Sequence, residues 1–326
     1  MLEAGDIITL GSDAWRLRAP LAGSSYGIVW EAESLGSGTP AALKLVNREQ
    51  MALALPPQRA RWSACAAAEI AFLRGLQPWD RRHIVRLLDS GAHEGEPAMA
   101  LELLDGDLAS HLAARRARGD AVGAAQALDW IAQVNQALAK VHQYGWRYLD
   151  LKPSNLLLDA PRNALKLADF GTNRPLLDAG AHSYAGTAGW QAPEQCMPEA
   201  DQAYRTDARS DYFALGALLY YLVTGTVLRW CARCAQAYRE LGAPGAARAL
   251  AGHADPLEAD EAALFLAHAL GQAPDTARAP LLALLRALLA PRPEQRPRHA
   301  LEISRLLAPA AAALASVAAP GLKAAA

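Results

Sequence analysis

The stretch Tyr148-Leu-Asp-Leu-Lys-Pro-Ser-Asn155 determines how the rest of the chain is interpreted. It lies between a segment with helical apolar spacing and the short apolar run Leu156-Leu-Leu, so we expect a loop between a helix and a strand. Asp150 and Asn155 are five residues apart, with Lys152 between them. A carboxylate can accept a proton, an amide oxygen can ligate a hard cation, and a lysine can neutralise an anion. These residue types favour chemistry on a charged, metal-bound group.

A second acidic motif, Asp169-Phe-Gly171, follows the apolar run Leu165-Lys-Leu-Ala168. Alone it is a weak signal, but downstream of Asn155 and directly after an expected strand it is a strong one. A carboxylate here would hold magnesium, and Gly171 would permit a sharp turn after it.

A candidate ion pair lies upstream of both motifs. Lys44 ends the motif Ala42-Leu-Lys44 on an expected strand, and Glu69 lies on the helix expected over Arg59 to Leu76. Two such charges about 4 Å apart attract by roughly 4 kcal/mol at an effective dielectric of about 20. Desolvation offsets much of that attraction, so we expect the pair to position Lys44 more than it stabilises the fold.

The four motifs together resemble those of the eukaryotic-type (Hanks-type) serine/threonine protein kinases, and the resemblance runs from about Leu21 to Leu307. The family uses ATP and Mg²⁺ to transfer a phosphoryl group to protein hydroxyls. The resemblance implies the following roles: Asp150 as catalytic base, Lys152 on the γ-phosphate, Asn155 and Asp169 as Mg²⁺ ligands, and Lys44 on the phosphates, held by Glu69. Heavy use of Ala and Arg favours a bacterial source.

The nucleotide site departs from the family pattern at its phosphate loop, Leu21 to Val29. Ala22 and Ser24 occupy the first two glycine positions, Gly27 falls on the pattern, and Gly23 is one place out of step. Small residues still allow the backbone to approach phosphates, so we expect weaker nucleotide binding rather than a different fold. By carry-over from the family, the adenine site comprises Val29, Ala42, Leu157 and the backbone from Glu102 to Leu104, with Leu101 as gatekeeper.

The second half of the sequence carries features typical of protein kinases rather than small-molecule kinases. Ala192-Pro-Glu194 closes an activation segment that begins at Asp169, and Arg296 resembles the ion-pair partner of Glu194. Asp211 resembles the buried carboxylate that anchors the catalytic loop. Gly186-Thr187 matches the serine/threonine branch, in which the threonine hydroxyl bridges the catalytic Asp and Lys.

Leu149 stands where many family members have an arginine that receives a phosphate from the activation segment. Leucine cannot make that charge-assisted contact. We therefore expect activity that does not depend on phosphorylation of Thr172, Ser183 or Tyr184.

The implied fold is α+β and bilobal, with a small antiparallel-sheet lobe over residues 1–104 that has one main helix, and a large helical lobe over residues 105–308. An Ala-rich tail, expected to be frayed, covers residues 309–326. We expect strands between Ile7 and Val46 and the further elements at these residues: strands at 84–88, 98–103, 156–158 and 165–167; helices at 59–76, 108–118, 125–144, 210–224, 259–271, 280–290 and 299–307.

The composition indicates an ordinary soluble protein with a formal net charge of -1 and four cysteines. No signal peptide or membrane span is evident, so we expect a cytoplasmic protein with no nucleic-acid or membrane partner. Cys231-Ala-Arg-Cys234 has zinc-knuckle spacing, but the other cysteines are far off in sequence, and two cysteines in an alanine-rich helical stretch are the preferred interpretation. The expected partner is a protein substrate, with a possible docking surface over residues 226–280. A pseudokinase scaffold is the alternative function.

Overall fold

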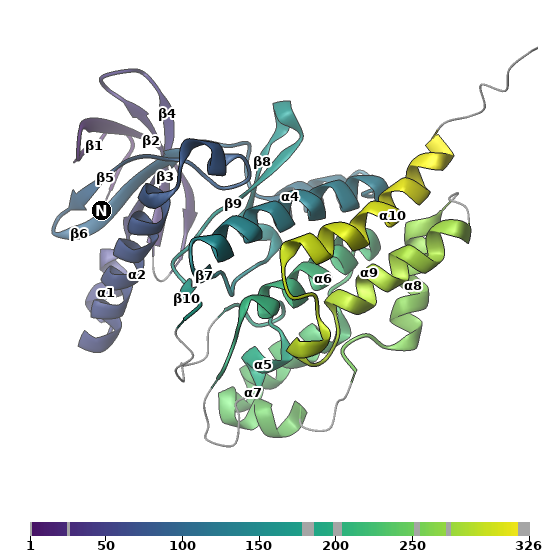
Figure 1. The fold of residues 1–326 in the computed structure, drawn as a ribbon. Coiled ribbons are helices and arrows are strands. Elements are labelled where there is room, and N and C mark those ends of the chain that lie inside the picture. Colours follow the sequence, from purple (N-terminus) through teal and green to yellow (C-terminus); the bar gives the residue numbers. More distant parts are fainter. Residues whose placement is uncertain are drawn as a thin grey trace, which may run out of the picture. The chain divides into compact units, whose positions relative to one another are not determined.

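A computed structural model of the chain describes residues 2–24, 27–177, 186–197, 204–250, 255–271 and 275–318. The strands within about the first hundred residues form one antiparallel sheet. The strand order is β1-β2-β3-β4-β6-β5. All neighbouring pairs are antiparallel. The strands, drawn in purple and blue in Figure 1, are β1 Ile7–Leu10, β2 Asp13–Gly23, β3 Gly27–Ser34, β4 Pro40–Val46, β5 Leu87–His93 and β6 Glu96–Glu102.

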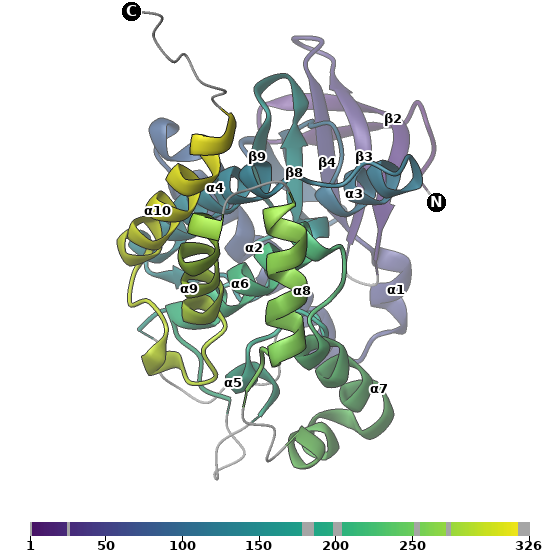
Figure 2. The same ribbon diagram turned by 90° about the vertical axis from the view of Figure 1, so that its right-hand side faces the viewer.

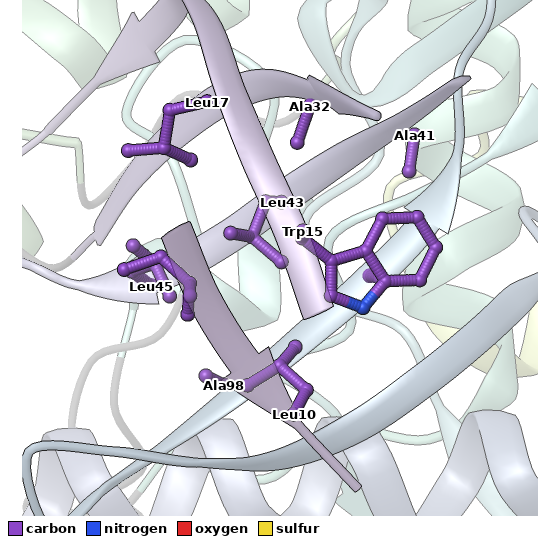
Figure 3. Packing of buried hydrophobic residues seen from close by; sticks show 10 residues of the cluster. Leu10, Trp15, Leu17, Ala32, Ala41, Leu43, Leu45 and Ala98 are labelled. Atoms are coloured by element: carbon purple, nitrogen blue, oxygen red, sulfur yellow. The ribbon is translucent and has the colours of Figure 1, made fainter. Parts of the chain in front are cut away.

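Alternation along β4 decides which face of the sheet carries Lys44. Ala41, Leu43 and Leu45 are buried in an apolar cluster with Trp15 and Leu17 (Figure 3). Because successive side chains in a strand point to opposite faces, Lys44 lies on the other face. Val29 on β3 is its direct cross-strand neighbour. The sequence of β4 thus places a lysine on the face opposite the apolar cluster.

Two helices follow β4, and α2 packs against β4, β5 and β6. Helix α2 spans Pro56–Gly75, and the short helix α1, Arg48–Leu53, precedes it. The expected start at Arg59 was wrong by three residues, because Pro56 takes the first helical position, where a missing N–H costs nothing. The far end of α2 buries Glu69, Ile70, Phe72 and Leu73.

The chain divides into two compact units, and segments from later in the sequence complete the first one. Unit 1 contains Met1–Asp105, Leu157–Ala160 and Lys166–Gly171, and unit 2 contains the remainder. Strand β8, Leu156–Asp159, pairs with β9, Ala164–Leu167. The strand expected at 84–88 begins later, at Leu87, as β5. Ile84 forms only an isolated parallel bridge with Leu167 of β9.

Unit 2 is built on α6, which is buried along nearly its whole length and packs against α4, α8 and α9. The predicted apolar face of α4 is confirmed, since Leu128, Ile131, Val134, Leu138 and Val141 are all buried. Figure 2 shows α8, α9 and α10 side by side. The elements of this unit are α3 Leu108–Ala117, α4 Ala124–Gln143, β7 Trp146–Arg147, β10 Arg174–Pro175, α5 Pro193–Cys196, α6 Ala208–Thr224, α7 Arg229–Leu250, α8 Ala259–Leu270, α9 Arg278–Leu288 and α10 Ala300–Ala318.

The last helix differs from its prediction, because α10 continues through Pro309 to Ala318 instead of ending before that residue. Proline removes one backbone hydrogen bond, but the alanines after it have the highest helix propensity. Ala310 and Leu314 are also buried, so packing supports the extension. The expected frayed tail at 309–318 is therefore helix, and residues 319–326 lie outside the described part of the chain.

The expected α+β organisation is confirmed: an antiparallel sheet with one main helix comes first, and a mainly helical unit follows. Among the described residues, no single helix has both the length and the apolar composition needed to cross a bilayer. Only the bent pair of α6 and Arg229–Gly242 meets the length and composition test when both helices are counted together.

Candidate active site

Lys44 is at the centre of an ion-pair cluster in unit 1. Its Nζ lies 2.8 Å from Glu69 Oε2 and 2.8 Å from Asp169 Oδ1. Burial by itself would lower the pKa of Lys44, but the two carboxylates outweigh it and raise that pKa. Lys44 is therefore protonated at neutral pH. Burial and the charge of Asp169 raise the pKa of Glu69, while Lys44 opposes them.

The backbone around Phe170 fixes the two acids of this cluster. The Phe170 N–H donates to Glu69 Oε1 at 3.1 Å, and the ring of Phe170 packs on Phe72 with centroids 4.6 Å apart. The turn expected after Asp169 is present at Gly171 and Thr172, and Asp169 itself has a φ of +58°. A left-handed aspartate is uncommon, and its short polar side chain tolerates that conformation. This conformation directs Asp169 toward Lys44.

A hydrogen-bonded chain connects the strand before Asp169 to the end of β6. Leu167 of β9 donates to the His83 carbonyl and accepts from the Val85 N–H, both at 2.9 Å. Glu102 then exchanges hydrogen bonds with Arg86: its N–H donates to the Arg86 carbonyl, and its carboxylate accepts the Arg86 N–H at 2.8 Å.

Lys166 closes this chain of contacts into a loop, since its Nζ lies 2.6 Å from Glu102 Oε1. Both side chains are mostly buried, with exposed fractions of 13% for Lys166 and 16% for Glu102. An adenine-contact candidate and a metal-ligand candidate are thus tied through short, buried contacts. The sequence gave no reason to single out Lys166.

Hydrogen bonds between Ser24 and Gly27 close the phosphate loop. The Ser24 N–H donates to the Gly27 carbonyl at 2.8 Å, and its Oγ accepts the Gly27 N–H at 3.1 Å. Asn47 donates to the Ser24 carbonyl at 2.8 Å. Strands β2 and β3 are in register here, with Ala22 opposite Val29 and Gly23 opposite Ile28. Tyr26 at the loop tip lies outside the described residues.

Gly27 is the more crowded of the two glycines in the phosphate loop. A Cβ atom there would lie 3.2 Å from the Leu45 carbonyl oxygen of the neighbouring strand, whereas one at Gly23 would meet nothing within 4 Å. The position that matches the sequence pattern is therefore the crowded one.

The adenine-site candidates in unit 1 combine partly exposed apolar side chains with a buried gatekeeper. Val29, Ala42, Leu104 and Leu157 are half-buried, and Leu101 is buried. Leu101 is the cross-strand neighbour of Ala42. The half-buried side chains leave apolar surface that a flat ring could cover.

The catalytic-loop candidates form a second cluster, in unit 2. Asp150 Oδ1 accepts the hydroxyl of Thr187 at 2.7 Å, and its Oδ2 lies 2.8 Å from Lys152 Nζ. Lys152 also donates to Thr187 Oγ1 at 2.5 Å. Asn155 Nδ2 donates to both the backbone carbonyl and Oδ2 of Asp150 at 3.0 Å. The predicted threonine bridge between Asp150 and Lys152 is present.

Asp211 holds the backbone of this loop through two hydrogen bonds. Its two carboxylate oxygens accept the N–H groups of Tyr148 at 2.8 Å and Leu149 at 2.6 Å. Leu149 is buried with φ of +65°, and its carbonyl accepts Gln195 Nε2 at 3.1 Å. A branched residue in the left-handed region is strained, so these flanking contacts hold the loop in a costly shape.

His142 also contacts the anchor, a role that sequence reasoning missed. Its Nε2 lies 2.8 Å from Asp211 Oδ2, and its Nδ1 lies 3.2 Å from the Tyr212 hydroxyl. Gln195 was likewise missed, although its position beside Glu194 in the quoted motif could have drawn attention to it.

The expected pair of Glu194 and Arg296 is confirmed and is buried. Arg296 Nη1 and Nη2 lie 2.7 and 2.9 Å from the two Glu194 oxygens. The guanidinium also donates to three backbone carbonyls, those of Arg209, Ala290 and Pro291. Such complete pairing is what a buried charge requires.

The predicted site residues thus form two groups, one in each unit. Unit 1 brings together Lys44, Glu69 and Asp169. Unit 2 brings together Asp150, Lys152, Asn155 and Thr187.

Comparison with known families identifies the fold that carries these groups. The family model described as "Protein kinase domain" matches residues 21–305. The chain belongs to the protein kinase family. The match includes the phosphate loop, both groups of site residues and the Glu194–Arg296 pair of this kinase domain.

Similar curated proteins carry serine/threonine-protein kinase names. The kinase domain is 31% identical over 205 residues to ATG1c of Arabidopsis thaliana, covering 62% of this chain and 25% of that protein. It is 39% identical over 105 residues to PknB of Mycolicibacterium smegmatis, covering 31% and 16%. It is 27% identical over 314 residues to pkn2 of Myxococcus xanthus, covering 94% and 34%. The chain thus spans at most about a third of the length of these relatives.

The donor atoms of the kinase domain fit magnesium. Asp169 offers carboxylate oxygen, and Asn155 uses its Nδ2 on Asp150, which leaves the amide oxygen as its acceptor. Each residue, in its own unit, offers the hard oxygen ligand that Mg²⁺ prefers. In the described ranges, no group of three or more His, Cys, Asp or Glu side chains could hold a metal ion.

Proposed function

We propose that this chain transfers the γ-phosphoryl group of Mg-ATP to serine or threonine hydroxyls of protein substrates. The observation that supports this best is the arrangement around Asp150, where Thr187 and Asn155 donate to the carboxylate and Lys152 forms an ion pair with it. Phosphoryl transfer needs mainly positioning and charge, and these side chains supply both. The kinase names of the relatives agree with it.

Asp150 would orient the substrate hydroxyl and accept its proton. Thr187 and Asn155 hold its two oxygens in place, so the carboxylate is preorganised before substrate arrives. Lys152 supplies positive charge at the same point and would reach the transferring phosphoryl group.

The residues of unit 1 would hold the nucleotide. Lys44, kept charged by Glu69 and Asp169, would contact the phosphates, and Val29, Ala42 and Leu157 would cover the adenine. The hinge backbone at Glu102 and Leu104 would hydrogen-bond its edge. Mg²⁺ bound through Asp169 and Asn155 would supply the charge that neutralises the phosphate oxygens.

Thr187 supports serine/threonine rather than tyrosine specificity. Its hydroxyl occupies the space between Asp150 and Lys152 at 2.7 and 2.5 Å, so this segment lies against the catalytic carboxylate. The scaffold alternative has no support in the comparisons, since the relatives named above are called kinases. We further propose that the protein acts in the cytoplasm, and that residues 226–280 offer a docking surface for its protein partners.

The test is a radiolabelled ATP assay with a generic protein substrate, followed by phosphoamino-acid analysis. Asp150→Asn should lower kcat by about 10² to 10⁴-fold, the usual contribution of a positioned base. Lys44→Met should abolish label transfer as well. Asp129→Asn, at an exposed aspartate of α4, is the matched control and should leave kcat unchanged.

Two outcomes would overturn the proposal. Label that appears on tyrosine alone would refute the specificity, and wild-type protein that binds Mg-ATP in equilibrium dialysis yet transfers no label would favour the scaffold.

A further inference from the structure

A cavity of about 250 Å³ lies within unit 1, beside the end of helix α2. The end of α2, the 3₁₀ helix Pro78–Arg81 and strand β5 form its walls. The lining residues are Leu73, Arg74, Arg81, Leu87, Leu88, Asp89 and Ser90. None of them belongs to either group of predicted site residues, so the proposed function leaves this cavity without a role.

Two arginines line the cavity, and within the described residues neither forms an ion pair. The Arg74 side chain contacts Ser90, with Nη2 2.6 Å from the hydroxyl oxygen. Arg81 donates from Nη2 to the Leu76 carbonyl at 2.8 Å, and its Nε is buried with no acceptor among the same described residues. Burying an unpaired N–H of a charged group is unfavourable, so the lining favours an anionic ligand.

Asp89 and Ser90 of β5 complete the polar lining. The Asp89 carboxylate accepts the N–H groups of Ser12 and Asp13 at 3.2 Å and of Ser90 at 2.8 Å, which holds it against the turn between β1 and β2. One carboxylate against two guanidinium groups leaves the lining net positive. Because the Ser90 oxygen accepts from Arg74, its O–H is left to donate to a ligand.

The size of the cavity and its apolar wall define the ligand further. A water molecule takes about 30 Å³ of liquid volume, so the cavity has room for more than a bare ion. Leu73 is buried, and Leu87 and Leu88 are half-buried, so the rest of the wall is apolar. An anionic group joined to a small apolar group would use both parts.

We propose that this cavity is a binding site for a phosphate monoester, with the phosphate on Arg74 and Arg81 and the organic group on the three leucines. A phosphate monoester carries nearly two charges at pH 7 and three acceptor oxygens, enough for two guanidinium groups and the Ser90 hydroxyl. A carboxylate has one charge and two oxygens, which serve a single guanidinium. A free small molecule and a phosphorylated protein side chain share this chemistry.

The experiment titrates the full chain with phenyl phosphate in magnesium-free buffer at low ionic strength. It follows the phosphorus NMR signal of the ligand and the arginine Nε–H signals of the protein. We expect saturable binding with a Kd of about 1 mM or lower. The Nε–H signal of Arg81, assigned by its loss in Arg81→Gln, should shift on titration.

Variants at the two arginines test the site itself. Arg81→Gln and Arg74→Gln should each raise the Kd by about tenfold or more, because each removes one charged fork. Arg74 is exposed, so its replacement tests the site even if Arg81→Gln perturbs the fold. Arg82→Gln is the matched control, since Arg82 is an exposed neighbour outside the lining and should keep the wild-type Kd.

Three further ligands define the chemical class and its source. Benzoate and inorganic phosphate should each bind about tenfold or more weakly than phenyl phosphate, because one lacks charge and the other lacks the apolar group. Benzoate that binds as tightly as phenyl phosphate would overturn the assignment to phosphate. A short phosphotyrosine peptide with the affinity of phenyl phosphate would identify a phosphorylated side chain as the source, and a peptide that does not bind would identify a free phosphate ester.

The proposed nucleotide site is tested separately. Phenyl phosphate should bind Lys44→Met with the wild-type Kd, whether or not the chain transfers phosphate from ATP. Loss of binding in Lys44→Met would place the ligand at the proposed nucleotide site and overturn the inference. An unmoved Arg81 signal, an unchanged Kd in both arginine variants, or no saturation up to about 10 mM would overturn it as well.

Discussion

The catalytic loop and the phosphate loop of this kinase domain are held in opposite ways. Tyr148, Leu149, Asp150 and Asn155 are all buried, and Asp211 and other polar side chains from distant parts of unit 2 hold them. Residues 21–24 of the phosphate loop are exposed and are held mainly by strand pairing and by Ser24. The proposed catalytic loop is fixed by buried contacts, whereas the phosphate loop is held by strand pairing and by a few exposed hydrogen bonds of Ser24 and Asn47.

The largest effect is expected from replacing Asp211, whose carboxylate holds the backbone of the catalytic loop. Asp211→Ala leaves two buried N–H groups, those of Tyr148 and Leu149, without acceptors. Each such group costs about 1–3 kcal/mol, so we expect the free energy of unfolding to fall by roughly 2–5 kcal/mol. Because Leu149 is strained, the loop should also relax, and kcat should fall by about 10²-fold.

Denaturant unfolding and steady-state kinetics measure the two effects. Asp207→Asn is the control, since Asp207 caps the start of the same helix, makes only a 3.8 Å ion pair with Arg209, and can be replaced as a cap by asparagine. A stable Asp211→Ala variant with kcat near that of the wild type would show that Asp211 is not the anchor.

The next prediction concerns Lys166 and Glu102, which tie the hinge to the strand before Asp169. Lys166→Met leaves the Glu102 carboxylate partly buried without its cation, so the hinge should shift. We expect KM for ATP to rise about five- to tenfold with kcat nearly unchanged, and Lys166→Arg should restore most of the loss. Glu33→Gln, which breaks the exposed pair with Arg18, should change neither parameter.

A fall in kcat with an unchanged KM for ATP would contradict the positioning role of Lys166. Equal losses in Lys166→Met and Lys166→Arg would also contradict it, because the arginine keeps the charge.

The motifs allowed the fold class and both groups of site residues to be predicted, because each site residue falls on a family motif, although Lys44 and Asp169 are 125 positions apart. Asp150 and Asn155 are held by one loop, and Lys44 faces away from the apolar cluster by strand alternation alone. Paired partners that the family motifs include, such as Arg296 for Glu194, were predicted for the same reason.

The partners that were missed come from tertiary packing, which leaves no local pattern. Lys166 alternates along β9 like any exposed residue, yet it is 13% exposed because Glu102 lies over it. The positive φ of Asp169 was missed as well, because glycine is the usual residue in that conformation.

The phosphate loop can be tested with two glycines that differ in crowding. Gly27→Ala brings a Cβ to 3.2 Å from the Leu45 carbonyl oxygen, and that strand backbone can yield only a little. We expect KM for ATP to rise about threefold in fluorescence titrations and kinetics alike. Gly23→Ala should have no effect, because nothing lies within 4 Å of its added carbon. Equal effects in the two variants would mean that crowding against β4 does not set the loop position.

The smallest expected effect concerns phosphorylation of the activation segment. Leu149 is buried and forms hydrogen bonds only through its backbone groups, to Asp211 and Gln195. Because the position holds leucine instead of arginine, it offers no cation that could bind a phosphate of the activation segment. Ser183 and Tyr184 lie outside the described residues, and Thr172 makes a 3.3 Å hydrogen bond to the Tyr148 carbonyl.

Replacing Thr172, Ser183 and Tyr184 together by alanine should therefore leave most activity, and prior treatment of wild-type protein with a phosphatase should do the same. Asp211 already orders the catalytic loop, so a phosphate on the activation segment should add little to kcat. A loss greater than about tenfold, worth about 1.4 kcal/mol, would mean that the loop needs a charge that Leu149 cannot bind, and that another cation in unit 2 supplies it.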